Sequence, residues 1–265
     1  MVSCLGRFKS PISTSRPHSN AVKRSGGRAP LTVGLPVSSV NACAGYAKLE
    51  NCWKGTLTGI ISVSTFRCST SWLTFPDDEV LQQAVRQHWG LRVLRQEPWE
   101  TLASFIASST KQIIQIRQIV ENLSRRFGQQ LDDNAYAFPP VAKIASATLP
   151  QLRACKLGFR AEYLRAAARL IDTGKLRLDA LPVMEYERAL EELQKIHGVG
   201  EKIANCTLLF SCGFEQAFPV DVWMQRSLHR LGWRSKKITR HQILNHFGPY
   251  AGWSQQYLFY SERSS

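Results

Sequence analysis

The sequence predicts a mainly α-helical protein, α+β overall, whose β region lies near the N-terminus. Two observations support this fold class. From about residue 76 onward, apolar residues recur at the three- and four-residue spacing of amphipathic helices. Residues 53–63 are instead rich in β-branched residues and contain turn glycines, which is typical of short strands. We therefore expect two helical lobes flanking a cleft, together with a partial and degraded N-terminal antiparallel β domain.

The helical pattern divides into individual segments. Residues 112–127, for example, place Ile116, Ile119 and Leu123 on one face, and the pattern stops at Gly128. Helices are expected in the same way at residues 79–87, 99–108, 112–127, 149–157, 161–173, 182–196, 203–212, 222–231, 239–247 and 251–261.

Composition divides the chain into three parts. Residues 1–40 are rich in arginine and serine and contain no acidic side chain, so we expect a disordered basic extension. The partial β domain is expected at residues 41–75, and the helical region at residues 76–265. Within that region, the central lobe is expected at residues 99–193. The second lobe is expected to combine residues 76–98 with residues 194–265.

The net charge favours a polyanionic partner. The chain has 34 Lys and Arg against 20 Asp and Glu, a formal charge of +14. The excess is uneven, because residues 1–75 hold nine basic residues and one acid. No apolar stretch reaches the roughly 18 residues of a membrane span. The seven cysteines form no CxxC pair, so we expect reduced intracellular thiols, no metal site and no cofactor.

A glycine-containing turn between two predicted helices is the most specific binding motif. It reads His197-Gly198-Val199-Gly200. Glycine permits a close approach of the backbone to a ligand, and the N–H groups that begin the following helix attract anions. We expect these four residues to contact a DNA backbone without reading its base sequence. The structural alternative is an ordinary turn between helices, with the glycines at a helix C-cap.

A lysine and a carboxylate follow this turn and form a candidate catalytic pair. Lys202 stands in the first turn of its helix, where the helix dipole disfavours an ammonium group and so favours an amine that can form a Schiff base. Asp221 precedes the helix expected at 222–231, at the N-cap position, and a carboxylate fixed there can stabilise a positively charged sugar. The alternatives are a phosphate-binding lysine and a plain capping aspartate.

Several further short sequence motifs accompany the hairpin, and their order along the chain is that of a known family. They are residues 94–100 (LRQEPWE), 105–112 (FIASSTKQ), 156–161 (KLGFRA), 219–222 (PVDV) and 248–255 (GPYAGWSQ). With these motifs, residues from about 75 to 260 resemble the 8-oxoguanine DNA glycosylases that also cleave abasic sites. These enzymes belong to the helix-hairpin-helix glycosylase superfamily, and the resemblance is strongest to the bacterial members.

The resemblance implies a role for each candidate residue. Lys202 would be the nucleophile that attacks C1′ of the damaged nucleotide, and Asp221 the carboxylate that assists it. Cys206 and Phe259 would stack on the two faces of the flipped base, and Gln255 would hydrogen-bond its Watson–Crick edge. Without the family, the first two would be read as core residues and Gln255 as a surface amide.

Phe159 and Arg160 match the pair that holds the orphaned cytosine; the alternative for Arg160 is a phosphate contact or a solvated side chain. Two nearby positions depart from the family. Gln115 stands where an arginine often reads the cytosine, and Thr110 replaces a gap-filling asparagine.

The N-terminal region departs further. The family motif Ser-Gly-Gln-x-Phe-x-Trp is not matched near residues 37–46, although residues 48–55 resemble the domain again. This interruption indicates either segments translated out of frame or a divergent domain, so the residue that reads the lesion cannot be assigned.

The predicted function is base-excision DNA repair, in which 8-oxoguanine is flipped out and excised and the abasic strand is cut by β-elimination. The expected partner is double-stranded DNA containing oxidised guanine, bound by a monomer. We expect a cytoplasmic, DNA-associated protein, at the nucleoid in a bacterium or in the nucleus of a eukaryote. The alternatives are another purine glycosylase of the superfamily, which Lys202 argues against, a non-catalytic DNA-binding protein, and the product of a damaged gene.

Overall fold

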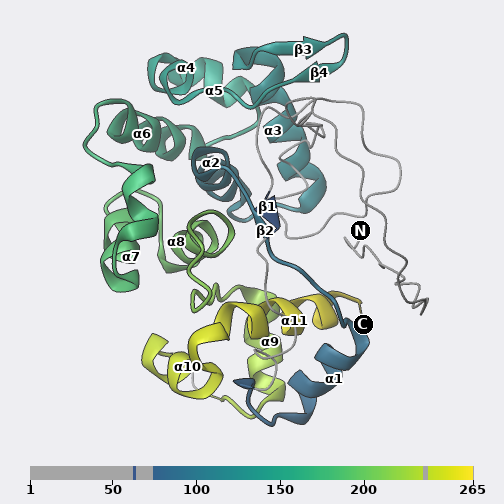
Figure 1. The fold of residues 1–265 in the computed structure, drawn as a ribbon. Helices are drawn as coiled ribbons and strands as arrows, with labels where there is room; N and C mark the ends of the chain where they lie inside the picture. The colour runs from purple at the N-terminus through teal and green to yellow at the C-terminus, as the bar shows by residue number, and fades with distance from the viewer. Residues whose placement is uncertain (1–61, 64–73, 235–237, 265) are drawn as a thin grey trace, which may run out of the picture.

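The structure, a computed structural model, describes residues 62–63, 74–234 and 238–264 (Figure 1). The α-helices are α1 (Glu79–Gln87), α2 (Pro98–Ser108), α3 (Ile113–Phe127), α4 (Val141–Ser146), α5 (Leu149–Ala154), α6 (Arg160–Asp172), α7 (Tyr186–Gln194), α8 (Glu201–Thr207), α9 (Val222–Arg230), α10 (Arg240–Phe247) and α11 (Ala251–Ser264). The other helical segments are the 3₁₀ helices η3 (Leu178–Val183) and η5 (Gly248–Tyr250) and the π-helix η4 (Leu208–Cys212).

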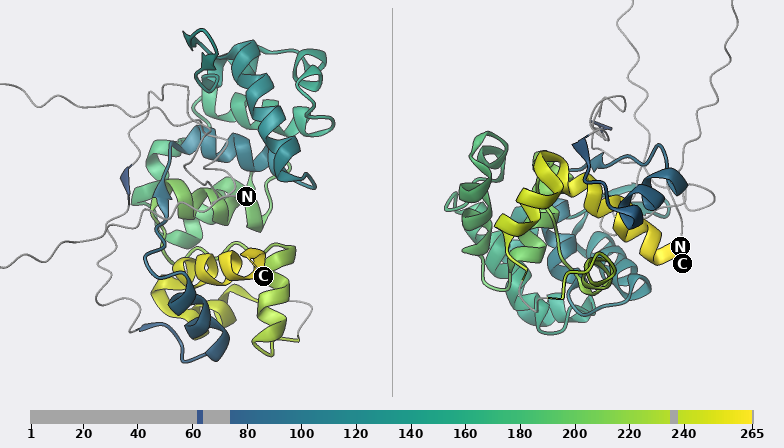
Figure 2. Two further views of the ribbon diagram at one scale, coloured as in Figure 1. Left: turned by 90° about the vertical axis from the view of Figure 1, so that its right-hand side faces the viewer. Right: turned by 90° about the horizontal axis from the view of Figure 1, so that it is seen from below.

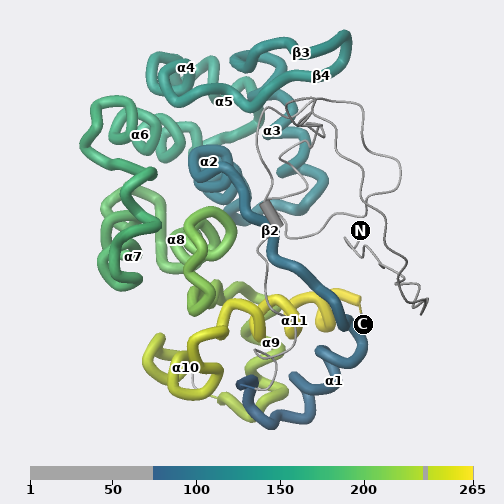
Figure 3. The backbone as a smooth tube through the Cα atoms, in the orientation of Figure 1, coloured from purple at the N-terminus to yellow at the C-terminus, as the bar shows by residue number. Residues whose placement is uncertain are grey.

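The helices form two groups. Helices α2 to α8 lie together and are called the central lobe below (Figures 1 and 2). The terminal lobe consists of α1, α9, α10 and α11, and α11 packs against the other three. The first and the last α-helix, α1 and α11, therefore meet in one lobe. From α1 the chain rises through β2 (Leu94–Arg95) into α2, a path that is easy to follow in the tube of Figure 3.

Short sequence signals explain where helices begin. Glu97 caps α2: its Oε1 accepts a hydrogen bond from the N–H of Trp99 at 3.0 Å, and its Oε2 accepts one from the N–H of Glu100 at 2.6 Å. Pro98 occupies the first helical position, where its missing N–H costs nothing. Threonine capping boxes begin α5 and α10 in a similar way.

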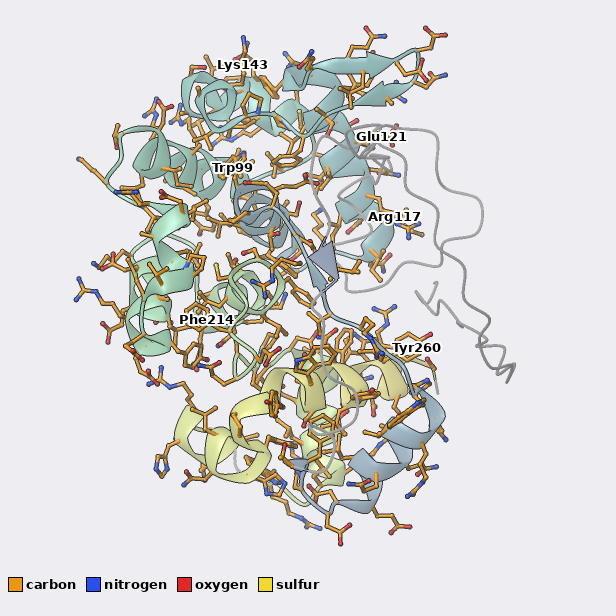
Figure 4. All side chains as sticks on the ribbon, viewed as in Figure 1. Trp99, Arg117, Glu121, Lys143, Phe214 and Tyr260 are labelled. Carbon is orange, nitrogen blue, oxygen red and sulfur yellow. The ribbon has the colours of Figure 1, made fainter. Side chains whose placement is uncertain are left out.

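Helix α2 is the centre of the central lobe. Its residues 101–107 are all buried, and Leu102, Ala103 and Ile106 have at most 1% exposure. A helix that is apolar on every side has to be surrounded by other elements. At its start, Trp99 donates from Nε1 to the carbonyl of Pro139 at 2.9 Å (labelled in Figure 4). This bond connects α2 to the loop that precedes α4.

The core of the terminal lobe is aromatic. Phe247, which is fully buried, stacks on Phe218 at a centroid distance of 5.0 Å and on Trp233 at 6.0 Å. Burying one such side chain contributes about 1.5–3 kcal/mol. The ring cluster holds α10 against the segment that leads into α9.

Strands are few in the described residues. β1 (Ser62–Val63) pairs antiparallel with β2, with Ser62 opposite Arg95 and Val63 opposite Leu94. β3 (Gln130–Asp132) and β4 (Ala135–Tyr136) form a small antiparallel hairpin beyond α3. No helix in the described ranges has the length and apolar character that crossing a membrane requires.

The mainly helical fold class is confirmed, and most predicted helices are found within one or two residues of their expected bounds. The helix expected at 149–157 is shorter, because α5 ends at Ala154 and the chain turns through Lys156 and Gly158, whose φ angles are +67° and +59°. The segment 182–196 is also divided: Pro182 lies in η3, and α7 begins only at Tyr186. Helix α4 and the β3–β4 hairpin were not predicted.

The predicted extension at residues 1–40 lies outside the described residues, as does most of the β domain predicted at 41–75. Within that domain, Ser62–Val63 is indeed a strand. The predicted lobe boundary at residue 194 separates α7 from α8. In the structure α8 packs against both α7 and α2, so it lies with the central lobe.

Candidate active site

The predicted hairpin joins α7 to α8. Gly198 has a φ of +86°, and a Cβ atom there would lie 2.3 Å from Cγ of Tyr163. A glycine is therefore needed at position 198 for two reasons: its positive φ angle and the close approach of the Tyr163 ring. Gly200, the N-cap of α8, has a φ of −90° and open space around it. His197, Gly198 and Gly200 are exposed, whereas Val199 is buried beneath the turn.

Lys202 lies in the first turn of α8 and is half-buried. Its Nζ is 4.9 Å from the ring centroid of Phe105 on α2, a distance at which the ring face attracts a cation. Phe105 is in turn stacked on Phe210 at 5.7 Å, with an interplanar angle of 16°. A column of two rings thus lies beneath the candidate nucleophile.

The π-helix η4 continues α8 and carries Phe210. Its wider turns are stabilised from outside the helix, since the carbonyl of Phe210 accepts from the N–H of Gln96 at 2.8 Å. It ends at Gly213, where φ is +83° and a Cβ atom would lie 2.4 Å from the guanidinium nitrogens of Arg95. Interruptions of this type are frequent at functional sites.

Asp221 is the N-cap of α9, as the sequence predicted. Its Oδ1 accepts from the N–H of Trp223 at 3.0 Å and from that of Met224 at 2.9 Å. Both bonds use the same oxygen, and no other hydrogen bond to this carboxylate occurs among the described residues. Oδ1 therefore orients the carboxylate, and Oδ2 accepts no hydrogen bond from the described residues.

Cys206 connects the two candidate catalytic residues. It lies one helical turn beyond Lys202 and is only 3% exposed. Burial raises the pKa of its thiol to about 11, while Lys202 lowers this pKa and Asp221 raises it. The thiol therefore lies within electrostatic reach of both the amine and the carboxylate, which come from different lobes, and it is neutral at physiological pH.

Gln255 and Phe259 lie one turn apart on α11. They are 3% and 9% exposed, and Oε1 of Gln255 accepts from Nε2 of Gln256 at 2.5 Å. Helix α11 packs against α9, which begins at Asp221. Two of the three predicted base-binding side chains, Gln255 and Phe259, are therefore on the terminal lobe, whereas the third, Cys206, is on the central lobe with Lys202.

Phe159 and Arg160 begin α6 and differ in environment. The ring of Phe159 is 54% exposed, whereas Arg160 is 3% exposed and its guanidinium carbon lies 4.3 Å from the centroid of that ring. Arg160 donates from Nε to the carbonyl of Ser109 at 2.7 Å and from Nη2 to Oγ1 of Thr110 at 2.5 Å. A third bond joins Nη1 to the carbonyl of Leu157 at 3.1 Å. Arg160 thus holds the turn after α2.

That turn is strained. Thr110 has a φ of +55°, a region that β-branched residues rarely adopt. Arg160 supplies the hydrogen bond that holds it there. Gln115, where the family often has an arginine, accepts at Oε1 from the N–H of Gln112 at 3.2 Å and so caps α3.

Two residues of this region were missed from the sequence, Phe105 beneath Lys202 and Tyr163 beneath the hairpin. Tyr163 stands one helical turn after Phe159, a spacing that could have drawn attention to it. For Phe105 no such signal exists, because an apolar residue in a buried helix is expected in any case. Among the described residues no group of three or more His, Cys, Asp or Glu side chains is arranged to hold a metal ion.

The comparison with protein families agrees with this geometry. Residues 103–250 match the family model of the HhH-GPD superfamily base excision DNA repair proteins, which spans more than half of the chain. The chain belongs to this superfamily. The preceding residues 62–102 match the N-terminal domain of 8-oxoguanine DNA glycosylase, so the β1–β2 pair falls within a recognisable part of that domain.

Individual members of the superfamily are similar over much of the chain. An N-glycosylase/DNA lyase of Saccharomyces cerevisiae is 31% identical over 71% of this chain, which spans 60% of the yeast protein. The solved 8-oxoguanine glycosylase/lyase of Clostridium acetobutylicum in complex with DNA is 28% identical, with a TM-score of 0.71 over 87% of this chain and 92% of that one. A DNA-3-methyladenine glycosylase of Bacillus subtilis is 29% identical over 69% of this chain and 62% of its own length.

Proposed function

We propose that this chain excises 8-oxoguanine from double-stranded DNA and then cleaves the abasic strand. The proposal rests on the position of Lys202 in the first turn of α8, directly after the hairpin and with its Nζ 4.9 Å from the Phe105 ring, and on Asp221, whose charge acts together with that of Lys202 on the buried Cys206 thiol. The yeast and clostridial relatives are named for the same combination of glycosylase and lyase activities.

Two covalent steps follow from these groups. The amine of Lys202 attacks C1′ of the damaged nucleotide as the bond from C1′ to the base breaks, and the base leaves with the electron pair and takes up a proton. Oδ2 of Asp221 stabilises the positive charge that develops on the sugar. The ring then opens to a Schiff base, and loss of a proton from C2′ expels the 3′ phosphate by β-elimination.

The flipped base would occupy a site shared between the lobes. Chemistry at C1′ of a base inside a duplex requires that the nucleotide be extruded into a pocket. The uncharged Cys206 thiol and the Phe259 ring offer two apolar faces for stacking, and Gln255 offers an amide for the Watson–Crick edge. Because these residues come from α8 and α11, the position of the lobes relative to each other would determine how tightly the base fits.

DNA would be gripped by the hairpin and by the start of α6. His197 to Gly200 present backbone N–H groups to a phosphate. Phe159 offers an exposed ring for stacking beside the orphaned cytosine, and Arg160, with N–H groups left over from its internal bonds, offers donors to its edge. The partner is thus DNA with oxidised guanine, bound by a monomer of this DNA-associated protein at the nucleoid or in the nucleus.

A second function, excision of alkylated purines, is favoured by the similarity to the Bacillus subtilis protein. Lys202 distinguishes the two, because a glycosylase that uses water as the nucleophile has no need of an amine at this position. The same preparation can be tested on duplexes that carry 8-oxoguanine or an alkylated adenine.

The decisive experiment is borohydride trapping of the full chain on a duplex with 8-oxoguanine opposite cytosine. We expect a covalent complex with the wild-type protein and none with Lys202→Ala, whose DNA affinity should stay nearly unchanged because only one of many charges is lost. The matched control is Lys195→Ala in the same hairpin, since Lys195 pairs with Glu192 at 2.8 Å. It should trap like the wild type. A covalent complex formed by Lys202→Ala at the wild-type rate would refute the proposal.

A further inference from the structure

We infer that Tyr163 is a positioning residue that couples the exposed ring of Phe159 to the hairpin turn, so that the two DNA contacts act as one unit. The inference rests on the proposed function, because it assigns Phe159 to the orphaned base and the hairpin to the backbone. Tyr163 itself is half-buried on α6 and is expected to touch neither the lesion nor the reacting atoms.

A continuous row of rings connects the two contacts. The Phe159 and Tyr163 rings meet edge to face, with centroids 5.7 Å apart and an interplanar angle of 75°. The Tyr163 and His197 rings meet in the same manner at 4.8 Å and 73°. Edge-to-face contacts have a preferred geometry, so a shift of one ring is resisted by the next.

The turn itself rests on the middle ring of this row. The Cβ position of Gly198 lies 2.3 Å from Cγ of Tyr163 and 2.9 Å from its Cβ, so the glycine backbone is pressed against the side chain. Gly200, two residues later, has nothing within 4 Å of its Cβ position. Of the two glycines of the turn, Gly198, which has the positive φ angle, is thus the one packed closely against α6.

The arrangement has a consequence for base extrusion. A nucleotide leaves the stack only if something fills the gap beside its partner while the backbone is held. Phe159 is exposed, and its ring is in contact with the Tyr163 ring and with the Arg160 guanidinium, so loss of the Tyr163 ring would remove one of these two supports. With the row intact, binding of the hairpin to the phosphates fixes the direction in which Phe159 enters the duplex.

The test compares one lesion in two contexts, paired opposite cytosine and unpaired opposite an abasic-site analogue, by single-turnover excision. Loss of the two ring contacts in Tyr163→Leu should slow excision of the paired lesion roughly tenfold. On the unpaired lesion, where extrusion costs less, the rate should change by no more than about twofold. Tyr163→Phe keeps both ring contacts and should retain the wild-type rates.

Controls separate this role from general stability. Tyr136→Leu makes the same substitution on β4, where the ring faces Arg125, and should leave the ratio of the two rates unchanged. If Tyr163→Leu does not fold, Gly198→Ala perturbs the same contact from the hairpin, with Gly174→Ala as its control, because Gly174 also has a positive φ (+70°) but open space around it. Gly198→Ala alone should then slow the paired lesion selectively.

Equal slowing of both substrates by Tyr163→Leu, or no slowing of either, would overturn the inference. Neither result touches the proposed function, which is tested separately by borohydride trapping of the wild-type protein and of Lys202→Ala on the paired lesion.

Discussion

The two proposed catalytic groups are held in different ways. Lys202 depends on residues far away in the chain, because its amine faces Phe105 of α2 and that ring rests on Phe210 of the π-helix. Asp221 depends on its immediate neighbours, the N–H groups of Trp223 and Met224. We refer to these as the lysine side and the aspartate side of the site.

The difference shows which substitutions separate folding from chemistry. On the aspartate side, Oδ1 accepts both capping bonds and the catalytic role is proposed for Oδ2, so a residue that keeps the cap can remove the charge cleanly. On the lysine side, the supporting residues are also core residues, so their effects on rate and stability should be coupled. Substitutions at three positions, Asp221, Glu100 and Phe105, test this comparison.

The largest effect is expected on the aspartate side, from Asp221→Asn, Asp221→Ser and Asp221→Ala. All three remove the carboxylate and should slow the chemical step about 10²- to 10³-fold, the usual cost of losing one electrostatic group from a transition state. Asn and Ser are good N-caps, so only Ala should lower the free energy of unfolding, by about 0.5–2 kcal/mol. Single-turnover rates and urea denaturation measure the two quantities.

If Asp221→Asn excised the lesion at nearly the wild-type rate, Asp221 would be a capping residue and nothing more. If all three variants lost stability equally, the separation of roles between its two oxygens would be wrong.

An intermediate effect is expected from Glu100→Gln. Glu100 lies in the first turn of α2, the helix that also carries Phe105 of the lysine side. Burial, and secondarily the charge of Glu97, raises the pKa of Glu100 to about 8, and its Oε1 is buried without a hydrogen-bond partner in the described residues. The folded protein thus keeps a proton that the unfolded chain loses near its ordinary pKa of 4.5. The contribution of Glu100 to the free energy of unfolding is therefore fully present below pH 4.5, the pKa in the unfolded chain. It is lost as pH rises through about 8, the pKa in the folded protein.

Wild-type stability should therefore fall by on the order of 2 kcal/mol between about pH 5 and pH 8. Glu100→Gln should remove this slope, and denaturation midpoints measured across that range would show it. Glu121→Gln is the control, because Glu121 is exposed and paired with Arg125 at 2.9 Å. An unchanged slope in Glu100→Gln would mean that another group titrates.

The smallest effect is expected from Phe105→Leu. This substitution keeps apolar volume but removes the ring face opposite Lys202 and the stack on Phe210, and should cost about 1–2 kcal/mol of stability. We expect excision to slow roughly tenfold with DNA affinity unchanged. In a double-mutant cycle with Phe210→Leu, the coupling free energy should be about 0.5–1.5 kcal/mol. A fully active Phe105→Leu would leave the lysine side without the support proposed for it.

The same division explains how much could be predicted from the sequence. The N-cap role of Asp221 and the first-turn position of Lys202 follow from a few adjacent residues, and the structure has both. The contact of Arg160 with Ser109 spans 51 residues and that of Trp99 with Pro139 spans 40. Helical periodicity shows that such residues face inward but not which residues they meet.

Local irregularities of the backbone, such as the π-helix, could not be predicted from the sequence for related reasons. Residues 208–212 are all buried, so their apolar pattern has no polar face from which a change of helical period could be detected. The short α4 presents only six residues, fewer than two turns of an amphipathic pattern. The strain at Thr110 depends on Arg160, which no local rule connects to it.

The π-helix also limits how the length of this chain can change. Each residue of an α-helix advances the chain by about 100° around the axis. Deleting Leu208 or Leu209 would let α8 continue as a regular helix, which its own hydrogen bonding would favour. It would also turn the Phe210 ring away from Phe105 and shift the start of the path toward Asp221. A more regular helix here would therefore disturb the candidate active site. The extra residue of the π-helix acts as a spacer, because it sets the rotation about the helix axis between the Lys202 amine and the path that leads to the Asp221 carboxylate.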